Sequence, residues 1–200
     1  EGMVHQRTLA PPAGYPNIRK FNRDLERYIL ESSTLTPDPY GASTRGGRHS
    51  DDLITNARGP ALLLKNMLQA AFAEYADALP VAPAHPFLGA PIGNLRLVAQ
   101  ANILASDGYL IPHVHPHAWV SGAYYVRVPR EINAKDSKRA GWLTFGGTPS
   151  EVVPSRPLPT RSIAPEEGML VLFPSYFYHG TEPFKGKRER LSLGVDVMSD

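Results

Sequence analysis

The chain has 200 residues, a length that one domain can have without disulfide support. Hydrophobic residues make up 42% and charged residues 20%, which argues against general disorder. The absence of cysteine excludes a disulfide framework, a thiolate metal site and a cysteine nucleophile. A net charge of +2 is too small to predict nucleic acid or a membrane as a partner. No apolar run reaches the ~18 residues of a membrane span, so we expect a cytoplasmic protein.

The N-terminal part of the chain is predicted to be helical. Apolar residues recur at helical spacing from Ile18 to Ile29, and Asn17 is a suitable N-cap. A second helix is expected over 60–79, because proline suits a first helical turn and apolar residues share one face. The polar stretch 33–50 between the helices is expected to be a loop. Both helices should cover a sheet.

From residue 93 onward the sequence predicts short strands. Apolar and β-branched runs alternate with turn signals, among them Ser106-Asp107-Gly108. Thr148–Thr160 contains four prolines and is expected to be an irregular loop. This spacing is typical of a sandwich, jelly roll or barrel. The expected strands are 95–101, 109–115, 119–128, 142–145, 169–173 and 191–197.

Three histidines lie within the segment Ile111-Pro-His-Val-His-Pro-His117. In an extended strand, His113 and His115 would share one face at roughly 6–7 Å along the chain, and both could bind one metal ion. The pair alone is equally consistent with surface histidines. Pro116 should end the strand pairing, which would leave His117 at the surface or behind the ligands.

A metal site of this kind needs a third ligand from a distant part of the chain. His179 is the candidate, since it follows the apolar run 169–173 after a short turn and is the last histidine of the sequence. By itself it would be read as a core histidine. Together with His113 and His115 it predicts a metal site.

The last predicted strand carries a second polar group. Arg190 and Ser192 share one strand face by alternation. An inward-pointing arginine needs an anionic partner, and its guanidinium suits the capture of a carboxylate. The neighbouring Arg188 is instead expected to belong to a solvated basic turn.

The order of these motifs resembles a known family. The motif HxHP is followed by Ser121-Gly-Ala-Tyr-Tyr125, Gly141-Trp-Leu-Thr-Phe145, Gly168-x-Leu-Val-Leu-Phe-Pro-Ser with His179, and Arg190-x-Ser192. In this order and spacing the sequence resembles the Fe(II)- and 2-oxoglutarate-dependent oxygenases, which are distant relatives of the prolyl hydroxylases.

The resemblance implies a mainly β fold with N-terminal helices: a double-stranded β-helix (jelly roll) with helices packed on one sheet. We expect one domain, in which 1–92 is a helical and loop support region and 93–200 is the jelly-roll catalytic core. The implied activity is that of a dioxygenase, a hydroxylase of unidentified substrate. It would use Fe(II), with 2-oxoglutarate and O₂ as co-substrates.

The same resemblance implies roles for single residues. His113 and His179 match the histidine ligands, Arg190 matches the residue that binds the distal carboxylate, and Ser192 matches its hydroxyl helper. Tyr125 matches a frequent co-substrate contact. Asn102, on the preceding strand, is expected to point to a similar region.

Position 115 departs from the wider superfamily, which usually has Asp or Glu there. His115 is nevertheless expected to coordinate, and three neutral ligands leave the site one negative charge short of the common triad. Two other classes therefore stay open. One is a cupin-type three-histidine metalloenzyme without 2-oxoglutarate, although the glutamate of that motif is absent from 118–123. The other is a non-catalytic jelly-roll binding module.

Overall fold

Two helices lie where the sequence predicts them. The computed structural model describes residues 2–89 and 94–199, and within it α1 spans Ile18–Leu30 and α2 spans Pro60–Ala78. Asn17 caps α1 by accepting a hydrogen bond from the Lys20 backbone N–H at 2.9 Å. Pro60 opens α2, where its missing N–H costs nothing. No helix of the described residues is long and apolar enough to cross a membrane.

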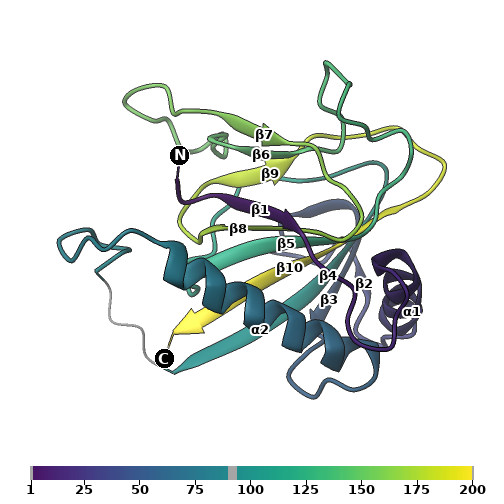
Figure 1. Cartoon of the computed structure of the whole chain (residues 1–200). Helices are drawn as coiled ribbons and strands as arrows, with labels where there is room; N and C mark the ends of the chain where they lie inside the picture. Colours follow the sequence, from purple (N-terminus) through teal and green to yellow (C-terminus); the bar gives the residue numbers. More distant parts are fainter. Residues whose placement is uncertain (1, 90–93, 200) are drawn as a thin grey trace.

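The described residues form two antiparallel sheets (Figure 1). The larger sheet has seven strands in the order β1-β8-β5-β10-β4-β3-β2, and the smaller has three in the order β7-β6-β9. The strands of the larger sheet are β1 (His5–Thr8), β8 (Met169–Pro174), β5 (Val120–Arg127), β10 (Arg190–Ser199), β4 (Leu95–Leu110), β3 (Thr44–Asp52) and β2 (Thr36–Pro37). The smaller sheet contains β7 (Arg161–Ile163), β6 (Leu143–Phe145) and β9 (His179–Thr181).

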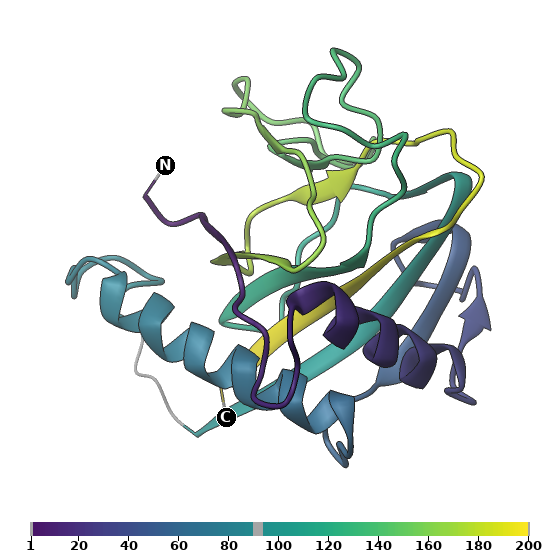
Figure 2. The ribbon, with the colours of Figure 1, turned by 45° about the vertical axis from the view of Figure 1, so that its right-hand side comes forward.

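The two faces of the larger sheet have different coverings. Both helices lie on one face (Figure 2), and their buried side chains belong to the same hydrophobic core as Leu170 and Leu172 of β8. The next side chains along β8, Val171 and Phe173, point to the other face and pack with Leu143 and Phe145 of the smaller sheet. Alternation along each strand therefore separates a helix-covered core from an inner face between the sheets.

The region before residue 93 contributes strands as well as helices. β3 lies largely within the polar stretch 33–50, so the expected loop there is wrong, and β1 and β2 were not predicted. β4 is one strand of 16 residues that runs through Ser106-Asp107-Gly108, where the sequence predicted a turn. A register shift between β3 and β4 marks an irregularity at this point, and Asp107 has a φ of 66°. The irregular loop expected over Thr148–Thr160 is confirmed.

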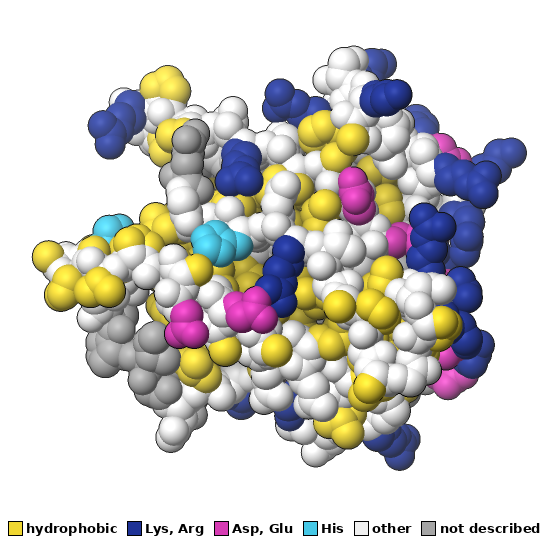
Figure 3. Space-filling model, in the orientation of Figure 1, with side chains coloured by type: hydrophobic (Ala, Val, Ile, Leu, Met, Phe, Trp, Pro, Cys, Tyr) yellow, Lys and Arg dark blue, Asp and Glu magenta, His cyan; other side chains and the backbone are white. Residues whose placement is uncertain are grey.

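A basic edge is visible on the helix-bearing face. In Figure 3, Lys and Arg side chains gather along the right-hand edge, where the loop from β9 to β10 turns in Figure 1. Lys185, in that loop, is exposed and forms an ion pair with Asp107 at 2.9 Å. Arg188 is also exposed, as expected for a solvated basic turn. Exposed pairs of this kind contribute little to stability.

One buried hydrogen-bonded group joins α1 to the sheet. The Tyr124 hydroxyl donates to Asn22 Oδ1 at 2.7 Å, and Asn22 Nδ2 donates to the Tyr125 carbonyl at 3.3 Å. Both side chains are buried, and the sequence stripe did not mark Asn22. Burial raises the pKa of Tyr124, so its hydroxyl stays protonated and remains a donor.

Tyr124→Phe is therefore expected to destabilise the protein, because it leaves the buried Asn22 oxygen without its donor. The expected cost is about 1–3 kcal/mol, a fall in Tm of roughly 3–10 °C for a chain of this size. Thermal unfolding followed by circular dichroism measures it, with the fully exposed Tyr40→Phe as the matched control. Equal melting temperatures for the two variants would contradict this account.

Candidate metal centre

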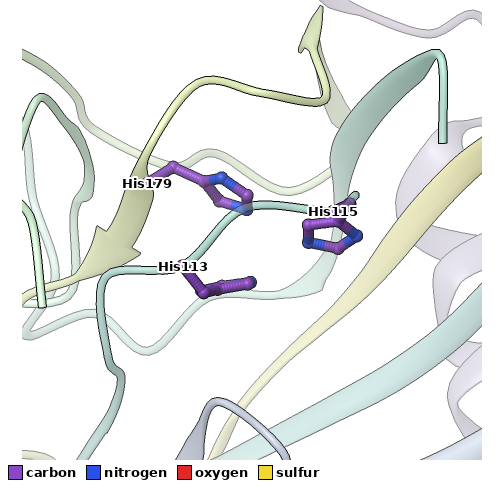
Figure 4. Close-up of side chains that lie close together, drawn as sticks. All are labelled: His113, His115 and His179. Carbon is purple, nitrogen blue, oxygen red and sulfur yellow. The ribbon is translucent and has the colours of Figure 1, made fainter. Parts of the chain in front are cut away.

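Three histidines converge from two segments that are distant in the chain (Figure 4). His113 and His115 lie in the segment between β4 and β5, and His179 begins β9. His113 and His179 exchange both backbone hydrogen bonds, at 2.9 and 3.0 Å, in an isolated β-bridge. The strand expected over 109–115 is wrong, since β4 ends at Leu110. The bridge to His179, and not strand alternation, brings the rings together.

The geometry of the cluster suits one small cation. Each ring offers one nitrogen such that these nitrogens all lie within 4.8 Å of one another. The ring centroids are 4.3 Å apart for His113 and His179, and 5.0–5.1 Å apart for the two pairs that include His115. His117, two residues beyond His115, is exposed and does not belong to the cluster.

Hydrogen bonds define the tautomer of each ring. His113 Nδ1 lies 2.7 Å from the Ile111 carbonyl, and His179 Nδ1 lies 2.9 Å from the Phe177 carbonyl. His115 Nδ1 lies 2.8 Å from a carboxylate oxygen of Asp196. Since carbonyl and carboxylate oxygens only accept, each Nδ1 must carry the proton. Each Nε2 then has a free lone pair, the form that binds metal.

Burial keeps two of these rings uncharged. It lowers the pKa of His113 to about 4, with the nearby His115 ring contributing. It also lowers the pKa of His179 well below the usual histidine value, assisted by both neighbouring rings. Neutral imidazoles at neutral pH are ready to bind a metal ion without first losing a proton.

Two residues behind His115 were not predicted as part of the site. Asp196 on β10 accepts from His115 through Oδ2, and its Oδ1 accepts from the Ser121 hydroxyl of β5 at 2.6 Å. Ser121 and Asp196 are directly paired in the sheet. The alternation that places Arg190 and Ser192 on one face places Asp196 there too, and that signal was available in the sequence.

Arg190 is buried without an anionic partner. Its side chain is 1% exposed, and Nε and Nη1 find no hydrogen-bond acceptor within the described parts of the chain. Its guanidinium carbon lies 5.1 Å from the centroid of the Tyr125 ring. The Tyr125 hydroxyl is likewise buried and unpaired among the described residues. Burial lowers the pKa of Arg190 and raises that of Tyr125.

Ser192 and Asn102 lie beside this arginine. Ser192 is buried on β10 and is paired with Tyr125 on one side and with Asn102 of β4 on the other. The carboxamide oxygen of Asn102 accepts from the Thr44 hydroxyl at 3.0 Å and lies 3.0 Å from His49 Nδ1. Asn102 therefore ties β4 to β3, a structural contact that the sequence did not predict.

These atoms form a site that fits a metal ion with an anionic ligand. The Nε2 atom of His115, the Tyr125 hydroxyl and two nitrogens of Arg190 are buried polar atoms without partners among the described residues. Leaving such atoms unpaired costs free energy, so a native structure keeps them where a ligand satisfies them. A cation would pair with the histidines, and a carboxylate would pair with Arg190.

An aromatic hollow adjoins the histidine cluster. Its volume is about 520 Å³, and its lining includes Phe87, Trp119, Ser175 and Tyr176. The Phe87 ring stacks on Trp119 with centroids 5.5 Å apart. Ser175 links the hollow to the cluster, since its carbonyl accepts a hydrogen bond from the backbone N–H of His115 at 3.0 Å.

Comparison with known proteins supports this fold. Residues 100–196 match the model of a family described as "Putative 2OG-Fe(II) oxygenase", where 2OG is 2-oxoglutarate, which confirms the resemblance seen in the sequence. The matched segment contains all three clustered histidines and Arg190. A search of curated protein sequences found no match.

Solved structures of prolyl hydroxylases share the fold. A prolyl-4-hydroxylase of Pseudomonas putida matches with a TM-score of 0.63 and 19% identity, over 100% of this chain and 94% of that chain. A Trichoplax adhaerens prolyl hydroxylase, in complex with a peptide of hypoxia inducible factor, matches with a TM-score of 0.61 and 14% identity, over 99% and 84% of the two chains. The collagen prolyl hydroxylase of Paramecium Bursaria Chlorella virus-1 matches with a TM-score of 0.59 and 11% identity, over 99% of this chain and 96% of that chain. The predicted double-stranded β-helix with N-terminal helices is confirmed.

Proposed function

We propose that this protein is an Fe(II)- and 2-oxoglutarate-dependent dioxygenase that hydroxylates a substrate C–H bond. The observation that carries the proposal is the pairing of two features on one inner face. Three histidines each offer one ring nitrogen to a shared point, and a buried arginine without an anionic partner among the described residues lies on the strand that also supports His115. A dicarboxylic keto acid that chelates a metal ion would satisfy both.

His113, His115 and His179 would hold the iron through Nε2, since Nδ1 of each ring is already used. Bound Fe(II) would supply oxygen activation, with 2-oxoglutarate and O₂ converted to succinate and CO₂ while one oxygen atom enters the substrate. Three protein ligands leave room at the metal for the co-substrates. The family match supports this chemistry, because that family is described by the same metal and co-substrate.

The remaining residues would bind and orient the co-substrate. Arg190 would form charge-assisted hydrogen bonds with the distal carboxylate, Ser192 would add a hydroxyl donor, and the Tyr125 hydroxyl would donate to the same ligand. Because Arg190 and Tyr125 are buried, a ligand that contacts them would be shielded from water, which would strengthen each of these contacts. Asn102 would border the pocket next to Ser192.

The proposal is tested by product formation in air. We expect the purified protein with Fe(II) and 2-oxoglutarate to release succinate slowly even without a primary substrate, as measured by NMR. Pyruvate, a keto acid that lacks the distal carboxylate, should not be turned over at the same concentration. Metal binding without any succinate would instead favour a three-histidine metalloenzyme that does not use 2-oxoglutarate.

A further inference from the structure

We propose that Asp196 is a positioning residue for the metal centre, which fixes the His115 ring and supplies the negative charge that three neutral ligands lack. The inference rests on the proposed function, in which His115 binds the iron. It adds a residue that acts on the metal through His115 and not by direct contact.

The contacts of Asp196 set it apart from the partners of the other rings. Its Oδ2 lies 2.8 Å from His115 Nδ1, and its Oδ1 accepts from Ser121 at 2.6 Å. His113 and His179 instead donate to backbone carbonyls, which carry no net charge. Among the described residues, Asp196 is therefore the charged side chain that forms a hydrogen bond with a ring of the cluster.

The carboxylate is also well placed to act through the ring. Its side chain is only 14% exposed, so solvent screens the charge weakly. It sits on β10, which pairs with β4 and β5 along its length, whereas His115 lies in a segment outside the strands. The hydrogen bond thus anchors the ligand to the sheet.

A carboxylate behind a ligating imidazole has two separable effects. The hydrogen bond fixes the ring orientation and tautomer, and the charge raises the basicity of the opposite nitrogen. Asparagine keeps an oxygen that can accept from His115 Nδ1 but removes the charge. Alanine removes both. Removing such a partner typically costs 10–100-fold in metal affinity.

The test is calorimetric titration of the metal-free protein with Ni(II). We expect Asp196→Asn to weaken Ni(II) binding by about 10-fold and Asp196→Ala by up to about 100-fold. Asp51→Asn, which removes a negative charge from an exposed position of β3, should bind as the wild type does. Thermal unfolding of each metal-free variant establishes that it is folded.

A second measurement separates charge from mere structural support. The Fe(III)/Fe(II) potential should become more positive in Asp196→Asn, because the charge that favours Fe(III) is lost, and should stay unchanged in Asp51→Asn. Wild-type affinity together with a wild-type potential in Asp196→Asn would overturn this inference alone. A wild-type protein that binds neither Ni(II) nor Fe(II) would overturn the proposed function and this inference with it.

Discussion

Replacing Arg190 with methionine is expected to remove most of the thermal stabilisation by 2-oxoglutarate while leaving the ligand-free protein at least as stable as the wild type. The two effects have one cause. Two guanidinium nitrogens are buried with no partner among the described residues, so the ligand-free protein carries the cost of a desolvated, unpaired charge. Methionine fills much of the same space without that cost.

The bound state is affected in the opposite direction. Truncating one member of a buried charge pair typically costs 2–5 kcal/mol, which corresponds to a loss of affinity of roughly 30-fold to several-thousand-fold. We expect saturating 2-oxoglutarate with Ni(II) to raise the Tm of the wild type, since a ligand that binds only the folded state stabilises it. In Arg190→Met loaded with Ni(II), 2-oxoglutarate should raise the Tm no more than pyruvate does, because only the chelating keto acid end of the ligand is still bound.

Two controls sharpen this experiment. Arg188→Met removes an exposed arginine from the same segment and should keep the full response to 2-oxoglutarate. Pyruvate should stabilise the wild type and Arg190→Met equally, because it offers no distal carboxylate. If Arg190→Met kept wild-type affinity for 2-oxoglutarate, Arg190 would not be the carboxylate-binding residue.

Removing one of the three histidine side chains of the cluster should have the largest effect on the affinity for the metal. His179→Ala deletes a proposed ligand, so we expect Fe(II) affinity to fall by more than the ~10–100-fold typical for loss of an outer partner. Succinate formation should be abolished. Anaerobic titration with Fe(II) and an NMR assay of succinate measure the two quantities.

His117→Ala is the matched control for this variant. It removes a nearby histidine that is exposed and lies outside the cluster, so metal binding and succinate formation should be unchanged. His113→Ala provides a second test at a less buried position if the loss of the His179 side chain lowers stability. Succinate formation by both ligand variants at the wild-type rate would exclude these rings from the mechanism.

The sequence predicted the members of the histidine cluster better than the way they meet. The chain has no cysteine, so imidazoles are its natural ligands for a transition metal. The closely spaced pair His113 and His115, together with the distant His179, therefore predicted the site. The strand proposed for His113 and His115 does not form, since Pro112 and Pro116 flank them and cannot donate to a ladder. Their meeting with His179 depends on a bridge between residues 66 positions apart, which local patterns do not encode.

The residues that were missed depend on sheet order in the same way. Asp196 becomes part of the site only because β10 pairs with β5 and brings it to Ser121, 75 residues earlier. β3 was hidden because glycines and polar residues dominate it. A Cβ added at Gly46 would lie 3.1 Å from Gly108, so this position of β3 requires glycine. In the sequence, the same glycine indicated a loop.

The helices and most strands of the jelly-roll part were predictable for the opposite reason. Their signals are local: the cap at Asn17, the proline at the start of α2, and apolar runs such as 169–173. Arg190 was predictable as an inward residue because it alternates with Leu191 and Leu193, which are buried on the helix-covered face. Its need for an anionic partner then follows from the cost of burying charge.

The most direct test of the account is anaerobic titration of the metal-free protein with Fe(II) and then with 2-oxoglutarate, followed by visible absorption. We predict a charge-transfer band that requires both components, because it arises when the keto acid chelates Fe(II). The band should be absent at the same 2-oxoglutarate concentration in Arg190→Met and fully present in Arg188→Met. Tight Fe(II) binding with no band at saturating 2-oxoglutarate would contradict the proposed use of this co-substrate.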